Sequence, residues 1–283
     1  MSNPFDSARG TSFGAAQGTP LLDVQHLSVA FGAVPAINDV SFQIAAGETL
    51  GLVGESGSGK SVTAFSILRL VQPPGRTTGG KILFQGRDLL ALSEHEMRDV
   101  RGAGISLIFQ EPMTALNPVM RIGDHIMEAL LVHGKASRAE ARARAIELLD
   151  AVRIPDAASR IRDYPHQLSG GMRQRVMIAI ALACHPPLVI ADEPTTALDV
   201  TIQAQVLELI RELKTRYNLA LLLITHDFGV IAEMAGRVAV MLRGRLVEEG
   251  PVRQILRAPQ HEYTQALLAA VPGMDRPTRE RTT

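Results

Sequence analysis

Gly54-Glu55-Ser56-Gly57-Ser58-Gly59-Lys60-Ser61 matches the pattern G-x-x-x-x-G-K-[ST] and lies between an apolar, strand-like run at residues 49–53 and a helix-like run at residues 62–70. Its glycines allow a tight turn, so that successive backbone N–H groups converge on phosphate oxygens at the start of the following helix. In this pattern Lys60 reaches the β- and γ-phosphates, and the Ser61 hydroxyl binds Mg²⁺. A flexible Gly/Ser linker would lack the flanking strand and helix. The segment therefore predicts a P-loop, which by itself does not separate kinases, GTPases, motors and transporters.

Composition limits the class of protein further. The chain has 283 residues, of which 46% are hydrophobic, and this is enough for the core of one large domain or two small ones. Because 29 basic and 29 acidic side chains cancel, no bulk positive charge would attract nucleic acid, and we expect no nucleic-acid partner. The single cysteine, Cys184, excludes a disulfide framework and an all-cysteine metal site within one chain.

No part of the sequence resembles a membrane span or a secretion signal. The longest uninterrupted apolar run, residues 176–184, is shorter than the roughly 18 residues that a span requires. The N-terminus lacks a basic segment followed by an apolar core, so we expect the chain to remain in the cytoplasm. Any membrane-spanning part of its assembly would then belong to another chain.

The order of strand-like and helix-like runs predicts an α/β fold. Early strands are expected to form a small, partly antiparallel sheet around the P-loop strand, and later strands, separated by helices, a mostly parallel sheet covered on both faces. A helical insertion is expected at about residues 111–167, where Ser137 and Glu140 form a capping box. The expected strands are residues 21–29, 40–44, 49–53, 81–85, 105–109, 188–191, 219–224, 237–242 and 245–247. The expected helices outside the insertion are residues 62–70, 169–184, 200–217 and 260–270.

These runs also divide the chain. We expect a flexible leader at residues 1–20, a nucleotide-binding domain at residues 21–250, and a C-terminal helix with a polar tail at residues 251–283.

Four polar residues follow the ends of predicted strands downstream of the P-loop. Asp192, at the end of an apolar strand, can hold Mg²⁺, and Glu193 can orient or deprotonate a water molecule. Gln110 could contact Mg²⁺ or the attacking water, and His226 would bring an imidazole to the same edge. Taken singly, each could be a capping or surface residue. Together they predict one catalytic group, because the carboxyl ends of parallel strands meet at one edge of a sheet.

A second glycine-rich segment, Leu168-Ser169-Gly170-Gly171-Met172-Arg173-Gln174-Arg175, lies some twenty residues before the Asp-Glu pair. Ser169 can cap a helix whose N–H groups at Gly170 and Gly171 form a second phosphate-binding end. This segment resembles the signature of ATP-binding-cassette (ABC) ATPases, and it argues against a P-loop kinase or GTPase. The resemblance implies a head-to-tail dimer, in which ATP lies between one subunit's P-loop and the other's signature helix.

The resemblance covers about residues 21–250 and implies ATP and Mg²⁺ as cofactors. It implies that Phe31 stacks on adenine, where the family more often has Tyr, and that Asp199 lies on the loop crossing the dimer interface. His226 would contact the γ-phosphate. Val62 stands where the family often has a hydroxyl residue, so it would offer only its backbone N–H to the α-phosphate. The implied ATP contacts are Phe31, Gly54, Glu55, Ser56, Gly57, Ser58, Gly59, Lys60, Ser61, Val62, Ser169, Gly170, Gly171 and Asp199. The expected catalytic residues are Glu193, His226 and Gln110, and the expected Mg²⁺ ligands are Ser61, Gln110 and Asp192.

Residues 109–118, 164–167, 199–205 and 261–268 together look like the ATPase subunits of bacterial dipeptide and oligopeptide importers. Such a subunit would lie at the cytoplasmic face of the plasma (inner) membrane. It would bind two membrane-spanning permease subunits, a second ATPase subunit, identical or different, and, through the permease, an extracytoplasmic solute-binding protein.

Two groups of alternatives stay open within this resemblance. Many peptide-importer ATPases continue into a Cys-rich tail associated with an iron–sulfur cluster, and the sequence up to Thr283 lacks those cysteines. Nickel, glutathione and phosphonate-utilisation systems, including a scaffold role in a phosphonate-cleaving complex, therefore remain possible. A soluble ABC protein of translation or DNA repair is disfavoured, because such proteins usually carry two cassettes or a long coiled-coil insertion.

Overall fold

A six-stranded sheet lies at the centre of the computed structural model, which describes residues 18–196 and 198–270. The strand order is β10-β9-β3-β8-β7-β6, and every neighbouring pair is parallel except β10 with β9. The strands are β3 (Thr49–Val53), β6 (Ile105–Ile108), β7 (Leu188–Asp192), β8 (Ala220–Thr225), β9 (Arg237–Leu242) and β10 (Arg245–Pro251). Because β3, β7 and β8 are covered on both faces, they are buried along their whole length. The predicted α/β class with a mostly parallel sheet is confirmed.

A separate antiparallel sheet has the strand order β2-β1-β4-β5. Its strands are β1 (Leu22–Phe31), β2 (Val34–Ile44), β4 (Gly75–Phe84) and β5 (Arg87–Asp88). The expectation that the P-loop strand belongs to this small sheet is wrong, because β3 pairs with β8 and β9 in the large one. Burial explains the difference: β1 alternates between buried and more exposed residues, whereas β3 is buried throughout.

Two strands of the antiparallel sheet begin upstream of their predicted starts at residues 40 and 81. The added parts of β2 and β4 contain residues typical of turns, such as Pro35 and Gly79. Both lie opposite residues of β1, Pro35 opposite Ala30 and Gly79 opposite Ser28. Pairing with β1 therefore overrides the local preference, and Pro35 is tolerated because β2 is an edge strand.

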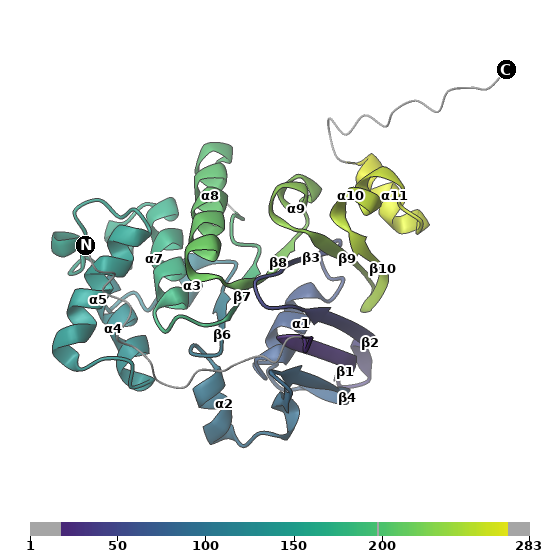
Figure 1. Ribbon diagram of the computed structural model, residues 1–283, viewed down its shortest axis with the longest axis horizontal. Coiled ribbons are helices and arrows are strands. Elements are labelled where there is room, and N and C mark those ends of the chain that lie inside the picture. Colours follow the sequence, from purple (N-terminus) through teal and green to yellow (C-terminus); the bar gives the residue numbers. More distant parts are fainter. Residues whose placement is uncertain (1–17, 197, 271–283) are drawn as a thin grey trace.

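Helices cover both faces of the six-stranded sheet, as Figure 1 shows. One face carries α7 (Gly170–Leu182), α8 (Val200–Tyr217) and α9 (Phe228–Met234). Leu221 and Leu223 of β8 belong to the core on this side. Leu222 and Ile224 point the other way, into a second core shared with α1 (Lys60–Ile67) and the antiparallel sheet. Successive residues of β8 thus point alternately into the cores on the two faces of the sheet.

The predicted helical insertion at about residues 111–167 contains several helices between β6 and β7. They are α3 (Pro112–Ala115), α4 (Ile122–Val132), α5 (Arg138–Ala151), α6 (Ala157–Arg160) and the 3-10 turn η2 (Pro165–Gln167). Ile126 and Leu130 of α4 are fully buried. At the start of α5, the Ser137 hydroxyl accepts the Glu140 N–H, and the Glu140 carboxylate accepts the Ser137 N–H at 2.8 Å. This is the predicted capping box.

Several short elements were not anticipated. They are the 3-10 turn η1 (Leu89–Ala91) and the helices α2 (Glu94–Val100), α9 and α10 (Val252–Arg257). They are too short to show a helical period, although the capping box of Ser93 and Glu96 at the start of α2 was readable. The predicted helix at residues 260–270 is α11 (Glu262–Ala269), and Asn218 ends α8 with the left-handed φ expected of a C-cap.

The predicted leader and tail fall largely outside the described residues, which end at residue 270 and start at residue 18. Within the part that is described, no helix combines the length and the hydropathy that crossing a bilayer requires.

Replacing Ser137 by Ala removes the hydroxyl that caps α5. We expect the free energy of unfolding to fall by about 1 kcal/mol, measured by urea denaturation followed by circular dichroism. Thr215→Ala is a matched control, because the Thr215 hydroxyl donates to the Arg211 carbonyl inside α8 and does not cap a helix start. Equal losses in the two variants would contradict the capping role of Ser137.

Candidate nucleotide-binding site

Four neighbouring strands bring polar residues to one edge of the parallel sheet. Gly54 follows β3, His226 follows β8, Glu193 follows β7, and Gln110 lies two positions after β6. These strands are adjacent in the order β3-β8-β7-β6. A cavity of about 930 Å³ at this edge is lined by the P-loop, Gln110, Glu193 and His226. The structure therefore brings the three predicted catalytic residues together beside the P-loop.

The P-loop turns sharply between β3 and α1. Gly54 has a φ of 154°, and a Cβ there would lie 2.2 Å from the Met241 carbonyl oxygen, so glycine is required. Gly59, with a φ of 108°, is the N-cap of α1. The Ser58 carbonyl accepts the Gly244 N–H at 2.8 Å. The turn between β9 and β10 is therefore hydrogen-bonded to the P-loop and stabilises its conformation.

Lys60 is a buried cation that lies on the loop itself. Its Nζ donates to the Gly54 carbonyl at 2.7 Å and to the Glu55 carbonyl at 2.9 Å, and the residue is 5% exposed. Burial lowers the pKa of Lys60, while the carboxylates of Glu193 and Asp192 act in the opposite direction. Because phosphate oxygens carry negative charge and backbone carbonyls do not, phosphate oxygens would be better partners for this ammonium group.

Asp192 has the properties expected of a ligand for a hard cation. It is 3% exposed, and burial raises its pKa, whereas the Ser61 hydroxyl and the Lys60 ammonium lower it. Its Oδ1 has no hydrogen-bond partner within the described ranges. Carboxylate and hydroxyl oxygens suit Mg²⁺, which usually binds through one or two carboxylates together with phosphates. Among the described residues no group of three or more His, Cys, Asp or Glu could hold a metal ion alone. A Mg²⁺ site formed by Ser61, Asp192 and Gln110 stays a prediction.

Glu193 is the centre of the polar group. Its Oε2 accepts hydrogen bonds from Thr196 Oγ1 at 2.8 Å and from Gln110 Nε2 at 3.2 Å, and its Oε1 lies 3.3 Å from His226 Nδ1. Its φ of 46° is unusual for a residue with a side chain and costs roughly 1–3 kcal/mol, which the surrounding contacts must offset. The Glu193 N–H donates to the Ile224 carbonyl. The carboxylate is thus fixed at the wall of the cavity.

The signature residues lie apart from this cavity. Ser169 caps α7 by accepting a backbone N–H at 3.3 Å, and both Ser169 and Gly170 are exposed. A Cβ on Gly171 would lie 2.7 Å from Ile202, so Gly171 also has a packing role between α7 and α8. Asp199 caps α8, and none of these residues lines the P-loop cavity. One chain therefore presents two separate helix starts suited to anions.

Of the two remaining residues predicted to contact ATP, one lies at the P-loop cavity and the other does not. Val62 lines the cavity, as expected of a residue that follows the P-loop. Phe31 does not line the cavity; it ends β1, is 36% exposed, and its ring lies against Gly75 at the start of β4. Adenine stacking on Phe31 stays a prediction.

Several residues at the site were missed by the sequence analysis. Thr196, which donates to Glu193, lies in the turn three positions after it, and this spacing could have suggested the contact. Arg243 lines the cavity, but the sequence analysis only left it between the expected strands at residues 237–242 and 245–247. The Tyr263 hydroxyl accepts the Glu55 N–H at 3.0 Å across 208 positions of sequence, and no local pattern indicates such a contact.

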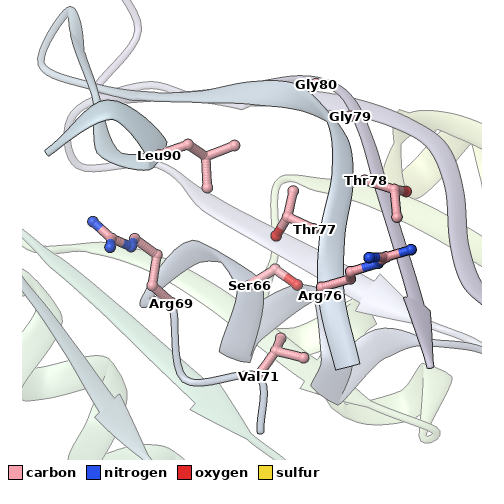
Figure 2. A pocket seen from close by; sticks show the side chains of 9 residues that line it. All are labelled: Ser66, Arg69, Val71, Arg76, Thr77, Thr78, Gly79, Gly80 and Leu90. Atoms are coloured by element: carbon pink, nitrogen blue, oxygen red, sulfur yellow. The ribbon is translucent and has the colours of Figure 1, made fainter. Parts of the chain in front are cut away.

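A second cavity, of about 470 Å³, lies between the end of α1, β4 and Leu90 (Figure 2). It is lined by Arg69 and Arg76, but their side chains point away from one another. Arg69 already donates to the Leu92 carbonyl at 2.6 Å and lies 3.8 Å from Glu94. Among the described residues that line this cavity there is neither a carboxylate nor an imidazole. The three residues predicted to be catalytic, Gln110, Glu193 and His226, line the P-loop cavity instead.

Comparison with known proteins agrees with this geometry. The family model described as ABC transporter matches residues 37–196. The chain belongs to the ABC transporter family. The cassette is accordingly an ATPase that energises transport, which decides against a kinase or a GTPase. A second family model, described as oligopeptide/dipeptide transporter, C-terminal region, matches residues 247–283.

The cassette is more than half identical in sequence to several curated proteins. It is 54% identical over 266 residues to a probable peptide ABC transporter ATP-binding protein of Sinorhizobium fredii, covering 92% of this chain and 79% of that protein. It is 53% identical over 260 residues to the dipeptide transport ATP-binding protein of Bacillus subtilis, covering 90% and 78%. It is 52% identical over 263 residues to the oligopeptide transport ATP-binding protein of Escherichia coli, covering 92% and 78%.

Solved structures give the same fold. The cassette superposes with a TM-score of 0.72 and 28% identity on a dimeric ATP-binding cassette in a post-hydrolysis state bound to ADP and Pi, covering 82% of this chain and 99% of that one. A second dimeric structure, of a bacterial ABC transporter cassette, gives the same TM-score, identity and coverage.

Lys60→Ala removes the P-loop ammonium group. We expect the dissociation constant for ATP to rise on the order of 10- to 100-fold, because a hydrogen bond to a charged group contributes about 1.5–3 kcal/mol. Titration with a fluorescent ATP analogue measures the change. Lys81→Ala, on the exposed part of β4, is the matched control and should bind as the parent protein does. Unchanged affinity in Lys60→Ala would contradict the P-loop assignment.

Proposed function

We propose that this ABC ATPase energises the import of dipeptides or oligopeptides across a bacterial plasma membrane. The observation that carries the proposal is the match of residues 247–283 to the oligopeptide/dipeptide transporter C-terminal region. This region lies beyond the ABC transporter match, which ends at residue 196, and its description names the kind of transporter. Relatives named as peptide, dipeptide and oligopeptide transport proteins support the same conclusion.

The proposed assembly places the cassette at the cytoplasmic face of the inner membrane. There it binds two membrane-spanning permease subunits and a second ATPase subunit, which is a copy of this chain or a companion. An extracytoplasmic solute-binding protein delivers the peptide to the permease. The peptide would not touch the ATPase, so specificity would come from the other subunits.

Hydrolysis in this proposal depends on positioning and electrostatics. The P-loop N–H groups and Lys60 bind the phosphates, and Glu193 orients and deprotonates the attacking water. His226, close to the same carboxylate, contacts the γ-phosphate, and Gln110 links Glu193 to the helical insertion. Mg²⁺, held by Ser61, Asp192 and Gln110, would supply positive charge at the phosphates.

The proposed dimer follows from the separation of the two anion sites. Ser169 and Gly170 are exposed at the start of a 13-residue helix, yet they do not reach the P-loop cavity of their own chain. A second subunit in head-to-tail orientation could place its P-loop, with ATP, against this helix start. Both similar solved structures are described as dimeric, which supports the arrangement.

Glu193→Gln should slow hydrolysis by orders of magnitude while ATP binding persists, because the carboxylate acts on water mainly in the transition state. The variant should then accumulate as a closed dimer in ATP, alone or with a companion subunit, as measured by size-exclusion chromatography. Adding Ser169→Arg should dissociate this dimer without emptying the P-loop, since a bulky cation would block the partner's γ-phosphate.

Ser159→Arg is the matched control for charge and size, because Ser159 is exposed in α6 of the helical insertion. The Glu193→Gln/Ser159→Arg protein should stay dimeric in ATP. A Glu193→Gln/Ser169→Arg protein that also stays dimeric would require the head-to-tail arrangement to be abandoned.

A path from the nucleotide to the permease begins at Gln110. The next segment forms α3, where Met113 is 61% exposed and its Sδ accepts a hydrogen bond from the Arg173 guanidinium at 2.7 Å. Arg173 belongs to α7, the signature helix. We therefore place the permease contact at residues 111–117 and the neighbouring insertion, where both Gln110 and the signature helix can transmit nucleotide state.

Photo-crosslinkers at Met113 or Met120 should capture a permease chain in the complex purified from its native membrane, while a crosslinker at Lys81 on the antiparallel sheet should not. Mass spectrometry identifies the captured chain, and the solute-binding protein that accompanies it can be tested for dipeptide and oligopeptide binding. If neither Met position captures a membrane protein, the coupling role is wrong. If the accompanying protein binds another solute, the peptide assignment is wrong.

A further inference from the structure

The peptide group between Gly54 and Glu55, at the entrance of the P-loop, is held at both ends. Its carbonyl oxygen, that of Gly54, accepts a hydrogen bond from Lys60 Nζ at 2.7 Å. Its N–H, that of Glu55, donates to the Tyr263 hydroxyl at 3.0 Å. In a trans peptide the carbonyl and the N–H point in opposite directions. Tyr263 therefore holds the P-loop from the side opposite Lys60.

Tyr263 belongs to α11, and this helix is firmly attached to the sheet. The Glu248 carboxylate of β10 accepts the N–H groups of Gln260 at 2.7 Å and His261 at 3.1 Å, just before the helix starts. His261 in turn caps α11 by accepting the Tyr263 N–H at 3.1 Å. Leu268 is buried in the main core, and the Tyr263 ring packs against the same core. The hydroxyl is thus presented to the P-loop by a fixed element.

The same helix also forms part of the cavity wall. Leu267 and Ala270 line the cavity that contains Lys60, Glu193 and His226. Tyr263 is partly buried, and burial raises its pKa, so the hydroxyl keeps its proton over the neutral range. A nucleotide bound at the P-loop would therefore meet a surface supplied by residues beyond the ABC transporter family match, which ends at residue 196.

We propose that Tyr263 is a positioning residue for ATP: by accepting the Glu55 N–H, it fixes the Gly54–Glu55 peptide and with it the P-loop conformation that receives the phosphates. It acts through the loop and does not touch the reacting atoms. The proposal rests on the ATP-binding function of the site. It assigns the C-terminal region, residues 247–283, a part in the nucleotide site of its own chain through α11.

Tyr263→Phe tests the proposal, because it removes the hydroxyl and keeps the ring. We expect the dissociation constant for ATP to rise about 2- to 10-fold, the range for losing one hydrogen bond of about 0.5–1.5 kcal/mol. The rate of hydrolysis at saturating ATP should stay within about twofold of the parent rate, since the loss falls on binding. Amide hydrogen exchange at Glu55 in the nucleotide-free protein should become faster. Tyr217→Phe, at the end of α8, is the matched control and should change none of these quantities.

A second variant tests the same contact by changing the attachment of α11, the helix that carries Tyr263. Glu248→Ala removes the acceptor that anchors the start of α11, and it should weaken ATP binding and speed Glu55 exchange in the same direction. This variant decides the matter if Tyr263→Phe fails to fold. Unchanged ATP affinity in Tyr263→Phe, or a lower melting temperature and turnover with unchanged affinity, would overturn the proposal.

Lys60→Ala, measured in parallel, separates this inference from the function on which it rests. If Lys60→Ala weakens ATP binding and Tyr263→Phe does not, only the positioning role of Tyr263 fails. If neither variant changes ATP affinity, the P-loop assignment fails as well.

Discussion

The parallel pairing of β3, β8 and β7 is the constraint on which the nucleotide site depends. Val53 lies opposite Thr225, and Ile224 lies opposite Asp192, so the strands end together and their next residues share one edge. A slip of one residue would move apolar side chains from one core to the other and leave both cores mismatched. The burial that stabilises the sheet therefore also fixes the positions of Gly54, Glu193 and His226.

Within this frame the charges of the P-loop site are incompletely balanced. One buried ammonium group, Lys60, lies near the carboxylates of Asp192 and Glu193, and an oxygen of Asp192 has no partner among the described residues. Buried charges and unpaired polar atoms cost free energy. Burial lowers the pKa of Lys60 and raises the pKa of Asp192, and both shifts favour the neutral form of the side chain. Phosphate and Mg²⁺ would supply the missing partners. In the proposed function, pairing of these groups with the nucleotide would contribute part of the affinity.

How far the sequence could predict the molecule depends on the range of each interaction. The P-loop, the residues after the strand ends and the capping box of Ser137 depend on neighbours a few positions away, and their patterns were readable. The full lengths of β2 and β4 were not, because Pro35 and Gly79 are extended only through pairing with β1. The placement of β3 needed its partners, and the contact of Tyr263 with Glu55 needed the docking of a helix from the far end of the chain.

The two phosphate-binding ends of the chain are attached to different parts of the fold, and this difference has a mechanical consequence. Tyr263 reaches the P-loop through α11, Glu248 and β10, and β10 pairs with β9, the neighbour of β3. Ser169 caps α7, which contacts the helical insertion, and Arg173 of α7 donates a hydrogen bond to Met113 of α3. In the proposed head-to-tail dimer, a rotation of the insertion with α7 would move the signature helix relative to the partner's ATP. The contact between Tyr263 and Glu55 would not be affected, because it connects elements attached to the sheet that carries the P-loop. The C-terminal helix α11 would then keep the P-loop of its own chain in one conformation while the proposed dimer opens and closes.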